Sequence, residues 1–215
     1  MDGIRASVLD AGRAITPLLA DPRVVARWSE PSALAELSIG GLAGHLVRAL
    51  ETIELYLDEP EPSDDRLIGP SSYFVAALKG AGRDIQSDAH RGVRQRGEEA
   101  GAMGPEALLA AHVGLLDRLA ERFEREPATR RVTVMRGAAR MKLDDYLPTR
   151  IVEMTVHADD LAASTGADPP AFGTDVTSCA IEVLVGTARE DRGDLAVLRA
   201  LARRERDADE ALRVL

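Results

Sequence analysis

Apolar residues recur every three or four positions between residues 38 and 58. The repeating set is Ile39, Leu42, Leu46, Leu50, Ile53 and Leu57. Side chains at this spacing lie on one side of an α-helix, so the pattern predicts a helix that buries a single face. Ser38 precedes the set and is a residue type that caps helix N-termini. The composition also favours helices, because 45% of residues are hydrophobic, mostly Ala, Leu and Val, and only 3% are aromatic.

Comparable spacing and punctuation predict helices along the rest of the chain. We expect them over Ile4 to Leu19, in a stretch from Tyr73 to about Gly101 that is interrupted near Gly80 and Gly82, from Pro105 to about Arg125, and from Asp144 or Asp145 to a stop at Gly166. Further on, we expect helices over Asp175 to about Ala188, Leu195 to about Arg204, and Asp207 to Leu215.

The segments between these helices are predicted to be connections. One contains Trp28 and Pro31, and the proline-rich acidic segment from Glu59 to Ser72 is expected to be a loop. Weak alternation from Arg131 to Met135 indicates a short extended piece that crosses the bundle. The sequence therefore predicts an all-α fold, a four-helix bundle with long connections over residues 1–166, and a short C-terminal helical extension, residues 167–215, packed on it.

Charge and composition restrict the partners. The formal net charge is −9, with no basic block, so nucleic acid and anionic membrane surfaces are not expected as partners. No apolar run is long enough to span a membrane. The first twenty residues contain several charged residues, which is unlike a signal peptide. The single cysteine, Cys179, excludes an internal disulfide and fits a reducing compartment, so we expect a cytoplasmic protein. No basic residue lies beside Cys179 in the sequence to activate it as a nucleophile. We therefore interpret Cys179 as an ordinary buried thiol.

Glu153 and His157 form the most informative pair of polar residues. They are four positions apart, so on a helix both side chains point the same way, with Cβ atoms about 5–6 Å apart. A carboxylate and an imidazole in this arrangement can bind one divalent metal, and zinc or nickel suits these ligands. His45, on the flank of the apolar stripe beside Leu42 and Ala49, is the natural third ligand. Such a site would generate a metal-bound hydroxide or thiolate at neutral pH.

Simpler interpretations stand beside this one. Glu153 and His157 could be an ordinary helix pair, with His45 packed independently. The glycines around His45, namely Gly40, Gly41 and Gly44, could leave space for a close backbone or a ligand, or belong in part to a frayed first turn. His112, in an apolar setting, is better read as a hydrogen-bonded core residue than as a ligand.

Two further charged residues lie one turn on either side of the pair. Arg150 could bind a substrate carboxylate through both arms of its guanidinium group, and Asp160 could orient His157 from behind. A solvated polar stripe is the competing interpretation of Asp160. His90 and the arginines Arg91, Arg94 and Arg96 mark the stretch before Gly101.

Two segments carry a family resemblance. They are Leu37-Ser-Ile-Gly-Gly-Leu-Ala-Gly-His45-Leu-Val-Arg and Tyr146-Leu-Pro-Thr-Arg-Ile-Val-Glu153-Met-Thr-Val-His157-Ala-Asp-Asp-Leu161. Both resemble the N-terminal metal-binding domain of mycothiol-dependent maleylpyruvate isomerases, which belongs to the DinB-like four-helix-bundle superfamily. The resemblance covers residues 1 to 166 and implies that His45, Glu153 and His157 are zinc ligands.

The resemblance also implies a cytoplasmic protein that uses mycothiol, a low-molecular-weight thiol, as cosubstrate. Isomerases of the family carry a second lobe that contributes to substrate binding, whereas Asp175 to Leu215 follow here. We therefore expect a zinc-dependent, mycothiol-linked transferase or isomerase-like enzyme whose partners are a small-molecule thiol and an electrophilic substrate, with room for a homodimer. The alternative is a non-catalytic helical bundle that serves ligand binding or dimerisation.

Overall fold

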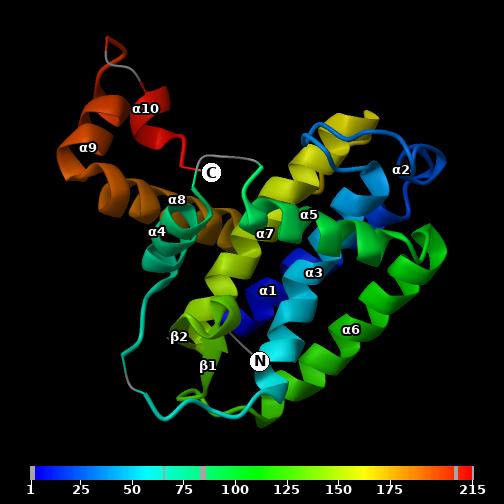
Figure 1. Ribbon diagram of the computed structural model, residues 1–215, viewed down its shortest axis with the longest axis horizontal. Coiled ribbons are helices and arrows are strands. Elements are labelled where there is room, and N and C mark those ends of the chain that lie inside the picture. The colour runs from blue at the N-terminus through cyan, green and yellow to red at the C-terminus, as the bar shows by residue number, and fades with distance from the viewer. Residues whose placement is uncertain (1–2, 65, 83–85, 206–207, 215) are drawn as a thin grey trace.

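Four long helices form the body of the protein, seen in a computed structural model that describes residues 3–64, 66–82, 86–205 and 208–214. They are α1 (Ile4–Leu19), α3 (Ile39–Asp58), α6 (Pro105–Arg125) and α7 (Leu143–Thr165). Helices α1 and α3 each pack against both α6 and α7, which closes a four-helix bundle (Figure 1). The predicted all-α class is confirmed.

The core consists of the apolar stripes that the sequence pattern predicted. All six residues of the α3 stripe are buried, and Ile15, Leu119 and Ile151 meet them from α1, α6 and α7 with no exposed surface. Burying one such side chain contributes about 1.5–3 kcal/mol relative to leaving it in water. The Ser38 hydroxyl accepts a hydrogen bond from the Gly41 backbone N–H at 2.8 Å, so the predicted cap of α3 is confirmed.

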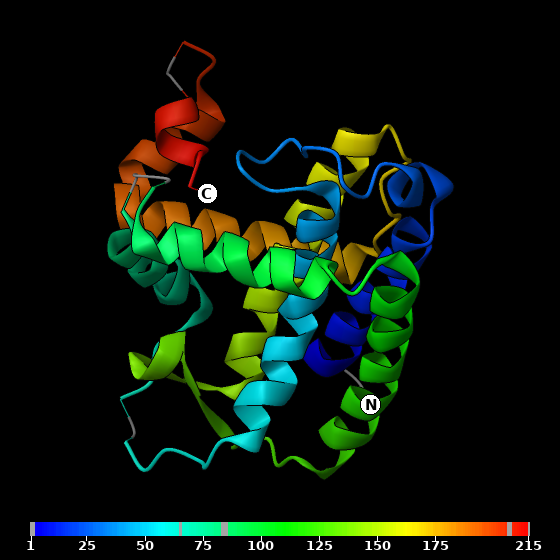
Figure 2. The ribbon, with the colours of Figure 1, turned by 45° about the vertical axis from the view of Figure 1, so that its right-hand side comes forward.

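Helix α5 (Asp88–Gly101) lies across the N-terminal half of α3 (Figure 2). The two backbones touch through glycines. A Cβ atom built on Gly44 would lie 2.4 Å from the carbonyl oxygen of Gly97, and one on Gly101 would lie 2.3 Å from the carbonyl oxygen of Gly40. The glycines near His45 therefore admit a close backbone.

The stretch after residue 58 differs from its prediction. It holds two helices, α4 (Pro70–Ala81) and α5, rather than one broken helix from Tyr73 to Gly101. Helix α4 starts inside the segment predicted as a loop, because Pro70 occupies a first-turn position where the missing N–H costs nothing. Gly82, with φ of 70°, ends α4, and the Ser87 side chain caps α5.

Short elements complete the connections. The predicted extended piece pairs as strand β1 (Arg131–Val134) with β2 (Ala139–Lys142), which the sequence did not indicate, around a 3₁₀ turn η1 (Met135–Gly137). Helix α2 (Pro22–Ala26) also went unpredicted in the segment that holds Trp28 and Pro31.

Helix α7 begins at Leu143, before the predicted start at Asp144 or Asp145. The Leu143 N–H donates to the Arg130 carbonyl at 2.8 Å and its side chain is fully buried, which fixes the chain there as it leaves the hairpin. Gly166 ends the helix in the left-handed conformation, as predicted.

The C-terminal part is helical. Helix α8 (Thr174–Arg192) packs against α7 and α4, and its residues Val176, Ala180 and Val183 join the main core. It is longer than the predicted Asp175 to Ala188.

Helices α9 (Asp194–Ala202) and α10 (Asp209–Leu212) extend away from the bundle (Figure 1). They pack through a small cluster of Ala188, Val197 and Val214. Helix α9 ends before the predicted limit at Arg204. Helix α10 is shorter than the predicted helix from Asp207 to Leu215, of which residues 207 and 215 lie outside the described residues. None of the helices in the described chain is long and apolar enough to cross a membrane.

Candidate metal centre

The histidine on α3 faces the predicted Glu/His pair on α7. Glu153 and His157 are one turn apart on α7, and His45 approaches them from α3, which packs alongside. All three side chains are partly buried, with about a fifth of their surface exposed (20–22%). The packing of two bundle helices thus brings His45 to a pair of residues that lies more than one hundred positions later in the sequence.

One carboxylate oxygen lies between the two imidazole rings. Oε2 of Glu153 is 3.3 Å from Nε2 of His157 and 3.6 Å from Nε2 of His45. The ring centroids of His45 and His157 are 4.6 Å apart, with the rings steeply inclined at 69°. The three potential ligand atoms all lie within 4.8 Å of one another.

These separations suit a small metal ion. Zinc binds nitrogen and oxygen at about 2.0–2.2 Å, so donors at tetrahedral corners are separated by about 3.3–3.6 Å. Two Nε2 atoms and one carboxylate oxygen also form the donor set that zinc accepts at sites with an open position. The three residues therefore fit a divalent metal, and a modest approach of the imidazoles would bring all three donor atoms within reach of one ion.

Asp160 fixes the orientation of His157. Its Oδ2 atom lies 3.0 Å from Nδ1 of His157, so Nδ1 donates its proton in a hydrogen bond to Asp160, and Nε2 faces Glu153. Burial alone would lower the pKa of His157, but hydrogen bonds with Asp160 and Glu153 outweigh it and raise the pKa to about 9. In the metal-free protein His157 is therefore an imidazolium between two carboxylates.

The pKa values of the other two triad residues, His45 and Glu153, are lowered rather than raised. Burial lowers the pKa of His45 and outweighs its hydrogen bond with Glu153. For Glu153, burial would raise the pKa, but His157, His45 and the charge of Arg150 together hold it well below its ordinary value. At neutral pH the metal-free centre consists of a neutral His45, a carboxylate and a cationic His157.

Arg150 lies behind Glu153 in an aromatic cage. Only 6% of it is exposed, and its guanidinium carbon lies 4.7 Å from the ring centroid of Tyr146 and 5.4 Å from that of Tyr73. It donates to the Tyr73 hydroxyl and the Thr149 hydroxyl, each at 3.0 Å, and an Nη atom is 3.9 Å from Oε1 of Glu153. Its positive charge thus faces the carboxylate. The predicted contact between Arg150 and a substrate carboxylate stays a prediction.

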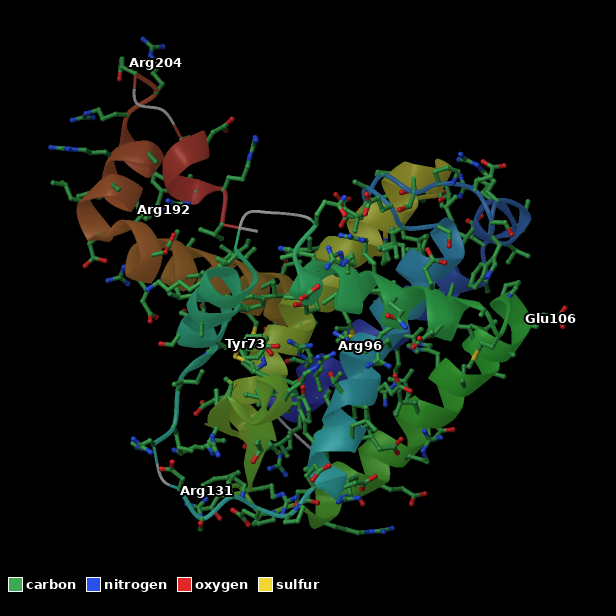
Figure 3. The ribbon with its side chains drawn as sticks, in the orientation of Figure 1. Tyr73, Arg96, Glu106, Arg131, Arg192 and Arg204 are labelled. Atoms are coloured by element: carbon green, nitrogen blue, oxygen red, sulfur yellow. The ribbon has the colours of Figure 1, made fainter. Side chains whose placement is uncertain are left out.

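The two tyrosines of this cage were missed in the sequence. Tyr146 stands one helical turn before Arg150, so i,i+4 spacing could have indicated it. Tyr73 comes from α4, and no local pattern connects it with α7; Figure 3 labels it beside that helix.

The remaining polar candidates lie elsewhere. His112 is fully buried between α6 and α1, where its Nε2 donates to the Gly12 carbonyl at 3.0 Å, so its interpretation as a core residue is confirmed. Cys179, on α8, is partly buried, and burial raises its pKa, which is unlike an activated nucleophile.

The fold and the three converging side chains define a helical bundle with a His/Glu/His ligand set between two of its helices. The family model described as mycothiol maleylpyruvate isomerase N-terminal domain matches residues 8–162, a range that contains all three. The chain belongs to this family, which confirms the resemblance, and the family and the triad together support a divalent metal as cofactor. No match was found among curated proteins or among solved structures.

Replacement of Asp160 by Asn is expected to weaken metal binding about 10–100-fold, the usual effect of losing a residue that orients a ligand. An amide can still contact Nδ1, but it lacks the charge that makes the imidazole a better donor. Competition with a chromogenic zinc chelator measures the affinity. Replacement of the exposed neighbour Asp159 by Asn is the control, and equal affinities for the two variants would contradict an orienting role for Asp160.

Proposed function

We propose that the protein is a zinc-dependent enzyme that activates mycothiol, as a transferase or isomerase-like catalyst acting on an electrophilic substrate. The observation that carries the proposal is the meeting of His45, Glu153 and His157 within 4.8 Å in a chain of this family. Nickel is the alternative metal for this donor set.

His45, Glu153 and His157 would hold the metal, which when bound would act as a Lewis acid that lowers the pKa of a thiol. The residues around the triad have separate tasks. Asp160 keeps the Nδ1 proton of His157 in place, so that Nε2 is the atom presented to a ligand. Arg150 adds its charge to the hydrogen bonds from His157 and His45 that keep Glu153 ionised, and the cage of Tyr73 and Tyr146 shields that charge from water.

Metal analysis of protein purified without chelator tests the first half of the proposal. We expect about one zinc per chain in the wild type, and a loss of most of it in His45→Ala. His112→Gln serves as a control, because that histidine is equally a nitrogen donor but lies in the core away from the triad. Wild-type protein that neither retains zinc nor takes it up on titration would overturn the proposal.

A thiol-consumption assay tests the second half. Mycothiol and an electrophile such as monobromobimane are mixed with the zinc-loaded protein, with metal-free protein, and with His45→Ala. The proposal expects faster conjugation only when both mycothiol and zinc-loaded wild type are present. Equal rates with free zinc and no protein would speak against catalysis.

A non-catalytic ligand-binding or dimerising bundle is the second candidate, and one observation favours it. The triad satisfies itself without metal, because the cationic His157 lies between Glu153 and Asp160, 3.3 and 3.0 Å away. Such a centre could persist as an internal ion pair in a protein that has lost metal chemistry. Absence of zinc uptake together with an unchanged thermal midpoint on zinc addition would favour this candidate.

A further inference from the structure

Three arginines from separate elements repel one another electrostatically beside α5. They are Arg48 on α3, Arg96 on α5 and Arg136 in the turn η1. A Cβ atom built on Gly92 would lie 3.2 Å from Nη1 of Arg96 and 3.7 Å from Nη2 of Arg136. Both guanidinium groups therefore reach the same point, over a residue that has no side chain to fill it.

Two of these cations form no salt bridge within the part of the chain that the structure describes. Among the described residues, no carboxylate oxygen lies within 4.0 Å of Arg96 or Arg136, whereas Arg94 on the same helix pairs with Glu36 at 2.8 Å. Arg48 is paired with Glu51. The chain has 36 acidic residues and 27 basic ones, so acidic partners are plentiful. Two arginines that face each other instead of a carboxylate therefore indicate a site for an anion.

The cluster is held together against its own repulsion. Burial, followed by the charges of Arg136 and Arg48, lowers the pKa of Arg96, and the charges of Tyr56 and Glu99 oppose this only in part. Arg136 also has left-handed backbone angles, φ 55° and ψ 39°, and Met135 before it has φ 52°. Such angles are uncommon for residues with side chains and persist only where the surrounding structure enforces them.

The cluster adjoins the metal centre. Arg96 precedes Gly97, and a Cβ on Gly97 would lie 3.3 Å from Cβ of His45. Arg48 lies three positions after His45 on α3. The ring of Tyr56 lies 5.4 Å from the ring of Tyr146 in the cage, and Tyr56 also interacts electrostatically with Arg96.

We propose that Arg96 and Arg136, assisted by Arg48, form an oxyanion subsite that holds a carboxylate or phosphate group of the small molecule used at the triad. A guanidinium offers a planar fork of N–H donors that matches either group, and two forks converging on one point select an anion with several oxygens. The link to the triad rests on the proposed function, whereas anion binding itself stands on the arginines alone.

Calorimetric titration of the full chain tests the subsite. Inorganic phosphate and succinate are titrated separately into chelator-treated protein at constant ionic strength, because salt would screen these contacts. We expect saturable binding of one equivalent of at least one anion, and the tighter anion identifies the group as phosphate or carboxylate. Arg96→Gln and Arg136→Gln should each weaken it about tenfold or more.

Matched variants exclude effects of net charge and of folding. Arg125→Gln removes the same charge from the exposed surface of α6 and should bind like wild type. Arg136→Gly removes the guanidinium while suiting the left-handed backbone, so it should fold normally and bind weakly. No saturable binding by wild type, or wild-type affinity in both Arg96→Gln and Arg136→Gly, would overturn the subsite.

The subsite and the proposed function fail separately. His45→Ala is expected to lose zinc but to keep its affinity for the anion, because the arginines remain. Wild-type protein that binds the anion but no zinc would leave the subsite standing and remove the metal function. Wild-type protein that binds zinc but not the anion would leave the metal function standing and overturn the subsite.

Discussion

Gly44→Ala is expected to lower the free energy of unfolding by roughly 3 kcal/mol, the upper part of the range for overpacking a tight contact. The added methyl group would lie 2.4 Å from the carbonyl oxygen of Gly97 and 2.6 Å from the backbone nitrogen of Gly101. Both obstacles are backbone atoms, so no side-chain rotation relieves the clash. Helix α5 would have to move away from α3 along their whole crossing.

Gly114→Ala is the matched control. Gly114 also lies inside a long helix, α6, but its Cβ would meet only the end of the flexible Arg118 side chain, at 3.5 Å. There the better helix propensity of alanine should stabilise the protein by up to about 1 kcal/mol. Urea unfolding followed by circular dichroism measures both variants. Equal effects of the two substitutions on the free energy of unfolding would contradict the close backbone contact between α3 and α5.

The same crossing connects stability with the metal centre. Gly97 of α5 covers His45, with a built Cβ only 3.3 Å from that of the histidine. Displacing α5 would therefore uncover His45 and separate Arg96 from the other arginines. Gly44→Ala protein that still folds should bind zinc more weakly, although Gly44 touches none of the three ligands.

Part of this arrangement could be predicted from the sequence. Glu153, His157 and Asp160 lie on one helix, where spacing alone fixes which side chains are neighbours. His45 was indicated by its place on the flank of an amphipathic helix, since a flank position can face an adjacent helix. The helical periodicity of the sequence was therefore sufficient to predict most of the proposed triad.

Contacts between distant elements could not be predicted in this way. The glycines near His45 were visible, but their partners Gly97 and Gly101 lie more than fifty positions later, and only the helix crossing brings them together. Tyr73 and Arg136 come from elements whose place against the bundle depends on tertiary packing. No local pattern marks them as neighbours of the site.

The shortest elements were missed for a related reason. Helix α2 has five residues, too few for a periodic signal, and β2, with the sequence Ala-Arg-Met-Lys, has little β propensity of its own. Strand β2 exists because it pairs with β1, in the register Val132 to Met141. The turn between them carries Arg136, so the error in the hairpin also concealed the arginine cluster.

The zinc affinity of the triad is expected to rise about tenfold per pH unit from pH 7 to about pH 9 and then to level off. A metal needs the lone pair of Nε2 of His157, which carries a proton in the metal-free protein because Asp160 and Glu153 raise the pKa to about 9. His45 and Glu153 add nothing to this slope. Burial keeps His45 neutral, and Glu153 is already ionised. One proton is therefore released per zinc.

The stability of the metal-free protein is expected to fall with rising pH, whereas the zinc affinity rises. A pKa raised above its ordinary value of 6.5 means that the folded state holds the His157 proton more tightly than the unfolded chain. This stabilisation is complete below pH 6.5 and is lost as the pH rises through about 9. Urea unfolding in the presence of chelator should therefore show falling stability over the same interval in which chelator competition shows rising zinc affinity.

Asp160→Asn distinguishes this cause from a general effect of pH on the fold. Without that carboxylate the pKa of His157 should fall, because a charged acceptor of the Nδ1 proton is lost. The zinc affinity of this variant should then level off at a lower pH, although it is weaker throughout. A slope of two protons in the wild type would mean that His45 is also protonated in the metal-free protein, and a plateau unchanged in the variant would assign the released proton to a group other than His157.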